Sequence, residues 1–261
     1  MRQYCSDIWN KWSEIPYPGQ ERVYHGIDVN AGSWPLMYLI RRENHFESPK
    51  GEKITFDLAH PSSFDFKSEL IEVEDVQTNI TKQQIAMAKY WGNGVPVMQI
   101  TPIILALIST YKITPARAGR IMASVNNTIN DAFVITWYYK YLFDYPRPVQ
   151  LNIKLKTVIS TPIFPTYPSG HSVVSGAVQM VLSYYFPSEA EKLNQIAEDA
   201  SISRLYGGIH YNCDLKQGLR LGRQIGSIIV EYLKSQEDKD NTMIDIPKTI
   251  FLDAPIMPKY E

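Results

Sequence analysis

Three short segments of this sequence concentrate side chains that bind oxyanions. The first runs from Lys140 to Pro148, the second from Pro168 to His171, and the third from Ser203 to Asp214. Cations, a Ser-Gly pair and two histidines are divided among them in a combination suited to phosphate-like groups. The candidate residues are Lys140, Arg147, Ser169, Gly170, His171, Arg204, His210 and Asp214.

The positively charged candidates suit the recognition of a tetrahedral oxyanion. Lys140, Arg147 and Arg204 supply three charges, and a planar guanidinium presents paired donors that match phosphate-like oxygens. Ser169 and the amide of Gly170 lie where a helix is expected to begin, and free N–H groups there face a bound anion. Each residue alone also has a structural interpretation, such as a turn, a helix end or an ion pair. The three segments together predict one anion site.

The two histidines supply groups for nucleophilic or acid–base chemistry. We expect His171 at the edge of the same site, directly after the Ser-Gly pair. His210 precedes Asp214 by four residues, a spacing that places the carboxylate beside the imidazole on a helical turn. Such a carboxylate fixes the tautomer and leaves the other ring nitrogen free as a nucleophile or metal ligand. A purely structural hydrogen-bonded pair is the alternative interpretation.

Helical patterns dominate the chain from residue 81 onward and predict the elements that position these segments. Thr114 and Pro115 have the residue types of an N-cap and a first helical position, and Pro146 and Pro148 require that helix to end before them. Pro187, Ser188 and Glu191 form a candidate capping box for a later helix. The expected helices span residues 81–91, 114–143, 169–186 (or from 172), 188–206 and 213–234, with a short apolar segment at 102–111.

The remainder of the chain is expected to be irregular. Prolines and glycines interrupt residues 1–76, which predicts an N-terminal wrap with short strands or turns rather than helix. Residues 77–235 are expected to form a helical core and residues 236–261 a tail. We therefore predict an all-α fold, a helical bundle in one domain over residues 1–261.

Composition limits the classes of function. The 26 basic and 27 acidic residues nearly balance, so the sequence has no charge excess typical of nucleic-acid or anionic-membrane binding. No apolar run reaches the roughly 20 residues of a membrane span. The two cysteines, Cys5 and Cys213, predict no disulfide framework. With no signal-peptide pattern at the N-terminus, we expect a soluble, cytoplasmic protein, although a secreted mature form remains open.

The three segments resemble the signature of one superfamily, with every position filled. That superfamily unites type-2 phosphatidate phosphatases, bacterial class A acid phosphatases and vanadium-dependent haloperoxidases. Flanking stretches at residues 130–140, 164–171 and 208–222 resemble the haloperoxidases, and residues 83–91 are similar to soluble bacterial haloperoxidase-like proteins. The resemblance covers roughly residues 80–230 and implies the helical bundle fold of the haloperoxidases and acid phosphatases.

The resemblance also implies a role for each candidate. His210 would be the axial residue bonded to phosphorus or to the vanadium of vanadate, and Asp214 would orient it. His171 would be the general acid–base. Trp137 and Phe164 would line the halide side of a haloperoxidase site, although core packing is the alternative for both. The residues implied to hold the equatorial oxygens are Lys140, Arg147, Ser169, Gly170 and Arg204.

Two activities fit the same constellation. A haloperoxidase would require vanadate as cofactor and would act on peroxide and halide to form hypohalous acid. A soluble phosphatase would need no cofactor, and would hydrolyse a phosphate ester through a phosphohistidine at His210 with His171 as acid and base. A non-catalytic anion-binding protein is a third hypothesis, and it conflicts with the complete signature. We expect small-molecule substrates, no nucleic-acid partner, and a homodimer as a possibility by fold analogy.

Overall fold

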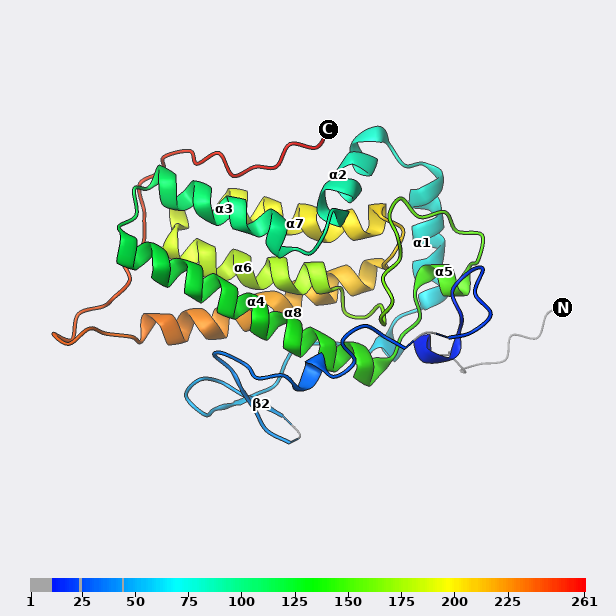
Figure 1. Cartoon of the computed structure of the whole chain (residues 1–261), viewed down its shortest axis with the longest axis horizontal. Helices are drawn as coiled ribbons and strands as arrows, with labels where there is room; N and C mark the ends of the chain where they lie inside the picture. Colours follow the sequence, from blue (N-terminus) through cyan, green and yellow to red (C-terminus); the bar gives the residue numbers. More distant parts are fainter. Residues whose placement is uncertain (1–10, 24, 44) are drawn as a thin grey trace.

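The computed structural model describes residues 11–23, 25–43 and 45–261, and helices dominate these ranges (Figure 1). The first ten residues, including Cys5, lie outside them, so the expectations for that cysteine and the extreme N-terminus concern residues that the structure does not describe. The all-α prediction is confirmed. The α-helices are α1 (Phe66–Thr78), α2 (Lys82–Gly92), α3 (Val97–Thr110), α4 (Pro115–Phe143), α5 (Pro148–Leu151), α6 (Gly170–Tyr185), α7 (Ala190–Tyr206) and α8 (Asn212–Lys234).

The bundle is built around α6, which packs against α4, α7 and α8 (Figure 1). Most residues of one continuous apolar core come from α3, α4, α6, α7 and α8, and a few come from α2, the N-terminal wrap and the C-terminal tail. The contact between α6 and α8 is close because two glycines of α8 face the backbone of α6. A Cβ on Gly222 would lie 2.0 Å from the carbonyl oxygen of Val173, and one on Gly226 would lie 2.6 Å from that of Ala177. Side chains larger than hydrogen would therefore push these helices apart.

The long helix α4 confirms the prediction for residues 114–143. As expected, Thr114 is its N-cap residue and Pro115 its first helical position, and the Thr114 side chain makes no capping hydrogen bond. The helix ends where Asp144 adopts a left-handed conformation with φ of 53°, and the Asp144 amide donates to the Lys140 carbonyl. Pro146 and Pro148 follow at once and prevent continuation. Lys140 is thereby fixed in the last turn of α4.

Three expectations about local structure were wrong. The N-terminal region is not wholly irregular, because α1 begins at Phe66 with the Asp65 carboxylate accepting from the Lys67 amide. The apolar segment at 102–111 is part of the longer helix α3, which continues through Pro102. The predicted capping box before α7 does not form, because a 3₁₀ turn, η4 (Pro187–Glu189), leads directly into that helix.

The rest of the N-terminal region wraps the outside of the bundle. Short 3₁₀ turns η1 (Trp12–Glu14), η2 (Ala31–Ser33) and η3 (Pro61–Ser63) alternate with the strands β1 (Ile40–Arg41), β2 (Phe46–Glu47) and β3 (Lys53–Ile54), which pair antiparallel in that order. The buried Asp131 carboxylate of α4 accepts hydrogen bonds from three successive backbone amides of residues 37–39. This carboxylate anchors the wrap to the bundle.

The residues after α8 return along the outside of the bundle toward α2 (Figure 1). The amide of Lys248 donates to the Tyr185 carbonyl at the end of α6, and the hydroxyl of Tyr260 contacts both Asp199 and Trp91. The tail thus ties α6, α7 and α2 together.

Among the described residues, no single helix is long and apolar enough to cross a membrane, whereas the bent pair α2–α3 passes that test by length and composition only.

Candidate active site

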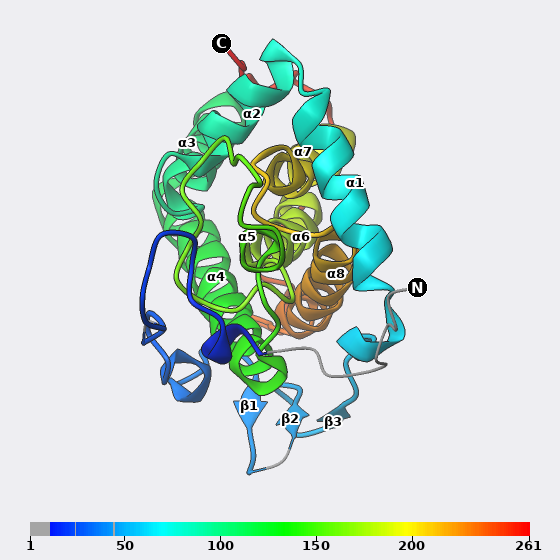
Figure 2. The same ribbon diagram turned by 90° about the vertical axis from the view of Figure 1, so that its right-hand side faces the viewer.

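The three segments meet at one end of the bundle. Helices α4 and α7 end there, and α6 and α8 begin there, because the four helices alternate in direction (Figure 1). Seen from that end, α5 lies in front of the bundle helices (Figure 2). Lys140 lies in the last turn of α4 and Arg204 lies in the last turn of α7, whereas Asp214 lies in the first turn of α8.

Lys140 is fully buried and is held by the loop between α5 and α6. Its Nζ donates to the carbonyl oxygens of Pro165 at 2.8 Å and Thr166 at 2.7 Å. An ammonium group has three N–H donors, so these two bonds leave one for another acceptor. Burial lowers the pKa of Lys140, and the neighbouring charge of Arg147 lowers it further.

Arg147 has an unpaired donor inside the site. Its Nε donates to the Phe164 carbonyl at 3.0 Å, and its Nη1 donates to the Ile209 carbonyl at 2.9 Å. Nη2 is buried and makes no hydrogen bond among the described residues, although the nearby Tyr17 hydroxyl acts to raise the pKa of Arg147. A buried guanidinium N–H without an acceptor is costly, and an oxyanion would satisfy it. Burial lowers the pKa of Arg147.

Arg204 brings a third buried cation from the end of α7. Its Nε donates to the Ser203 hydroxyl at 2.9 Å, and its Nη2 donates to the Ala88 carbonyl of α2 at 3.1 Å. Burial lowers its pKa to about 9, and the charge of Arg147 acts in the same direction. The Arg204 side chain is almost fully buried, so this cation lies in a low-dielectric environment.

The charges of the site are unbalanced without an anion. Lys140, Arg147 and Arg204 face one buried carboxylate, Asp214, which raises the pKa of the first two. Burial of like charges is unfavourable. A tetrahedral dianion placed among them would offset their repulsion, and its oxygen would accept a hydrogen bond from the unpaired Arg147 donor. Phosphate and vanadate are such anions, and the donor set fits either.

The start of α6 adds a helix N-terminus to the site. Ser169 is its N-cap, and its hydroxyl accepts from the Ser172 amide at 3.4 Å, while its own amide donates to the Asp214 carbonyl. Gly170 is the first helical residue, so its amide has no acceptor within the helix. The positive end of the α6 dipole therefore points toward the cations of the same site.

The predicted pairing of His210 with Asp214 is present. Nδ1 of His210 lies 2.8 Å from Oδ2 of Asp214, and its Nε2 lies 3.0 Å from Nη1 of Arg147. A guanidinium only donates and an ionised carboxylate only accepts, so the proton is on Nδ1 and the lone pair is on Nε2. Burial and the charge of Arg147 hold the pKa of His210 well below its usual range. The imidazole is therefore neutral, with a nucleophilic or ligating nitrogen inside the site.

His171 lies beside these groups, partly exposed at the start of α6. Its Nε2 donates to the Trp91 carbonyl of α2 at 2.9 Å, which leaves Nδ1 as the proton-accepting nitrogen. Burial and the charge of Arg204 lower the pKa of His171 well below its usual range. An anion in the site would offset these cations and make protonation easier.

Trp137 and Phe164 are both partly buried and contact one another, with ring centroids 4.8 Å apart. The Phe164 ring lies over two of the cations, 5.2 Å from Nζ of Lys140 and 4.9 Å from the central guanidinium carbon of Arg147. Trp137 donates its indole N–H to the carbonyl of Ile27 in the wrap. The two rings therefore form an aromatic wall beside the cations.

The sequence reasoning missed Thr166, a fully buried residue in the loop before α6. Its hydroxyl lies 2.5 Å from Oδ2 of Asp214 and 3.0 Å from Nδ1 of His210. Its position two residues before Pro168 was the available signal, and a threonine there indicates nothing without the fold.

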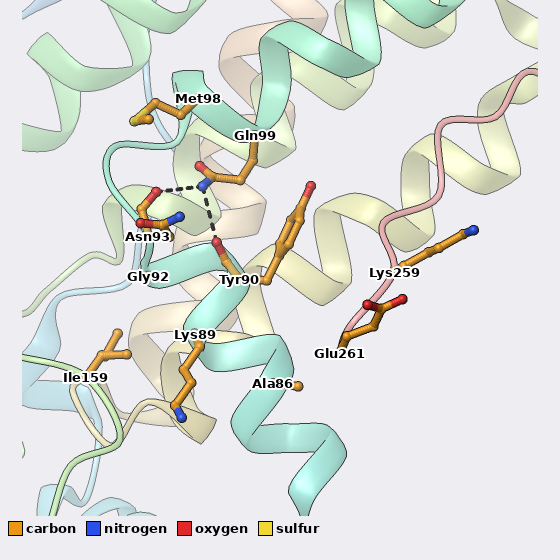
Figure 3. Close-up of a pocket in the computed structure, with 10 residues that line it drawn as sticks. All are labelled: Ala86, Lys89, Tyr90, Gly92, Asn93, Met98, Gln99, Ile159, Lys259 and Glu261. Atoms are coloured by element: carbon orange, nitrogen blue, oxygen red, sulfur yellow. Dashed lines mark hydrogen bonds between the residues drawn. The ribbon is translucent and has the colours of Figure 1, made fainter.

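A cavity of about 660 Å³ lies at the C-terminal end of α2 (Figure 3). Gly92, Gln99 and Ile159 are among its lining residues, and the Gln99 amide donates to two backbone carbonyls there. None of the anion-site cations lines it, although the Ile159 side chain also lies against Gly207, which belongs to the third segment of the site. Within the described ranges, no group of three or more His, Cys, Asp or Glu residues is arranged to hold a metal ion.

The PAP2 superfamily model matches residues 120–237, which include all the candidate residues. A vanadium-dependent bromoperoxidase of Corallina pilulifera is 29% identical over 115 residues, which are 34% of this chain and 19% of that protein. The vanadium chloroperoxidase of Curvularia inaequalis is 28% identical over 182 residues, which are 53% of this chain and 30% of that protein. This chain therefore spans less than a third of the length of these curated relatives.

Solved structures with the same fold include a bacterial vanadium-dependent iodoperoxidase. That structure has a TM-score of 0.64 and 27% identity, and the match covers 85% of this chain and 60% of the other. An apo-form bacterial vanadium-dependent chloroperoxidase has a TM-score of 0.69 at 14% identity, covering 88% of this chain and 63% of the other, and shows likeness of fold alone. The chain has a haloperoxidase-like helical fold.

Proposed function

We propose that this chain is a vanadium-haloperoxidase-type enzyme. The premise is that the chain belongs to the PAP2 superfamily and has vanadium haloperoxidases among its relatives. The observation that carries the proposal is the buried excess of positive charge around an unpaired Arg147 donor. This arrangement calls for a resident oxyanion rather than a neutral ligand.

The enclosure of the site supports vanadate and small reagents. Lys140, Arg147 and Asp214 are 0% exposed, and His210 is only 3% exposed. A phosphate ester would have to carry its organic group past this enclosure, whereas peroxide and halide are small. The relatives described above include bromo-, chloro- and iodoperoxidases, which supports this choice.

Each side chain has a defined task in this proposal. Vanadate, when bound, supplies a Lewis-acidic centre at which peroxide becomes able to oxidise halide. Nε2 of His210 is the nitrogen available to ligate it, and Asp214 keeps the proton on Nδ1. The three cations and the start of α6 hold the oxygens, and Nδ1 of His171 accepts or returns a proton. Trp137 and Phe164 are proposed to line the halide side.

The alternative proposal is a soluble phosphatase, and the lone pair on Nε2 of His210 favours it equally. In that reaction Nε2 would attack phosphorus, and His171 would protonate the leaving alcohol. Water, deprotonated by His171, would then release the phosphohistidine. The donor set that fits vanadate would hold the equatorial oxygens of the phosphoryl group.

A paired assay on one protein preparation, stripped of phosphate, separates the two activities. One half receives orthovanadate, hydrogen peroxide and bromide or iodide with a halogenatable dye, and the other receives a chromogenic phosphate ester. We expect vanadate-dependent halogenation and negligible ester hydrolysis. Ester hydrolysis that vanadate inhibits, without halogenation, would establish the phosphatase instead and return Trp137 and Phe164 to a packing role.

Replacing His171 with alanine should separate chemistry from binding. We expect turnover to fall by about 10²–10⁴-fold, the usual contribution of a general acid–base. Vanadate affinity should fall only a few-fold, because the cations that hold the anion remain. The measurements are steady-state turnover and equilibrium dialysis of vanadate. A variant that no longer binds vanadate would show that His171 supports the structure of the site rather than its proton transfers.

A further inference from the structure

We propose that Thr166 is a positioning residue that fixes the His210–Asp214 pair and Lys140 relative to one another. The inference rests on the proposed function in one respect, that the site accepts an oxyanion through Nε2 of His210. The signature of the three segments does not include this threonine. Its backbone and its hydroxyl contact opposite sides of the site, so one residue couples helix α4 to helix α8.

The hydrogen bonds of Thr166 reach three parts of the fold. Its carbonyl accepts from Nζ of Lys140 at 2.7 Å, and its amide donates to the Tyr145 carbonyl at 3.0 Å. Its hydroxyl contacts Oδ2 of Asp214 at 2.5 Å and Nδ1 of His210 at 3.0 Å. All of these contacts are buried, so water does not compete for them.

Only one assignment of protons satisfies the three side chains. The Thr166 hydroxyl has one hydrogen, which goes to Asp214 because a carboxylate accepts. The oxygen of the hydroxyl then presents its lone pairs to Nδ1 of His210. Two acceptors, Oδ2 of Asp214 and Oγ1 of Thr166, therefore surround the Nδ1 proton, and together they keep Nε2 unprotonated and facing Arg147.

The orientation of the Asp214 carboxylate also depends on Thr166. Oδ2 accepts from Thr166, His210 and the Tyr211 amide, whereas Oδ1 is buried without a partner among the described residues. Removing the hydroxyl would leave one fewer bond to hold Oδ2 toward the imidazole. The carboxylate would gain freedom to rotate, and the Nδ1 proton of His210 would keep only one of its two acceptors.

Three variants test this role. Thr166→Val removes the hydroxyl and keeps the shape, Thr166→Ser restores it, and Thr166→Ala provides a second removal should the valine variant fold poorly. The matched control is Thr128→Val, because Thr128 is also fully buried in the bundle but, among the described residues, its hydroxyl bonds only the Ser124 carbonyl of its own helix. Thermal unfolding of all four variants measures the general cost of losing a buried hydroxyl.

The decisive readouts are the ¹⁵N NMR signals of the His210 ring, in protein with ¹⁵N-labelled histidine, and the Kd of vanadate. We expect the wild type to show protonation at Nδ1 alone, and Thr166→Val to show a shifted Nδ1 signal, because the Nδ1 proton then keeps one acceptor, Asp214, instead of two. We also expect vanadate to bind about 10-fold more weakly to Thr166→Val, the scale of one lost charge-assisted hydrogen bond. Thr166→Ser should return both values to near those of the wild type.

Two results would overturn the inference. One is a wild-type ring spectrum in Thr166→Val and Thr166→Ala. The other is an equal change in Thr128→Val, which would indicate a general packing effect. The ring spectrum is measured on the resting protein, without peroxide, halide or ester. Absence of both enzymatic activities would therefore remove the proposed function while leaving the role of Thr166 decided by the spectrum.

Discussion

Replacing His210 with alanine is expected to reduce turnover by at least about 10⁴-fold in whichever half of the paired assay the wild type is active. Nε2 of this residue is the nitrogen that faces the cations, and Asp214 holds the proton on the opposite ring nitrogen. Alanine supplies neither a nucleophile nor a ligand. The variant should still bind the anion through the cations. Its residual activity should be small, because the site then lacks the imidazole that attacks or ligates the anion.

The matched control for His210→Ala is His45→Ala. His45 is a partly exposed imidazole that pairs with Glu47 in the small sheet, far in sequence from the three segments. This control should keep wild-type turnover, because the sheet lies outside the bundle. Steady-state rates at saturating substrate, with circular dichroism to verify folding, are the measurements. Near-wild-type turnover of a folded His210→Ala protein would refute the site as described.

Replacing Arg147 with lysine is expected to weaken phosphate and vanadate binding by about 100-fold or more. Lysine keeps the charge but loses the planar fork, so one ammonium must replace donors that now reach the carbonyls of Phe164 and Ile209. The unpaired Nη2, which is the donor we assign to the anion, has no counterpart in lysine. Loss of bonds to a charged group costs about 1.5–3 kcal/mol each.

Thermal unfolding with increasing anion measures this effect without any assay of activity. A ligand at 100 times its Kd stabilises the folded state by about 2.7 kcal/mol, so phosphate or vanadate should raise the Tm of the wild type. Arg147→Lys should show little increase over the same concentrations. The control Arg223→Lys, at a partly exposed arginine of α8 that pairs with Glu198, should respond like the wild type. An unchanged response of Arg147→Lys would mean that the anion binds elsewhere.

Much of the fold was readable from the chain because its signals are local. The proline pair after Asp144 and the helical pattern before it defined α4, and Ser169, the first of the two expected starts, is the N-cap of α6. Helix α1 was missed because its sequence, Phe66–Thr78, has a weak apolar stripe and follows a proline-rich region. Its burial is supplied by contacts with α7 and α8, which are distant in sequence.

One part of the candidate site could be predicted from local sequence spacing, and another part could not. His210 and Asp214 are four residues apart at the start of one helix, so their pairing follows from helical geometry. Thr166 has no comparable local signal. It reaches this pair only because the loop before α6 passes between the ends of α4 and α8, and its carbonyl meets Lys140 for the same reason.

The sequence by itself determined which groups are available: three cations, two histidines, one carboxylate and a helix-starting Ser-Gly pair, at spacings set by helix geometry. Only the tertiary structure decided the protonation states of these groups and which hydrogen-bond donors are left without an acceptor. Packing of α6 on α4, α7 and α8 buries the cations together, which lowers the pKa of His171 and His210 and leaves Nη2 of Arg147 without an acceptor. Those properties depend on distances between segments far apart in the chain, because desolvation and Coulomb interactions act through space.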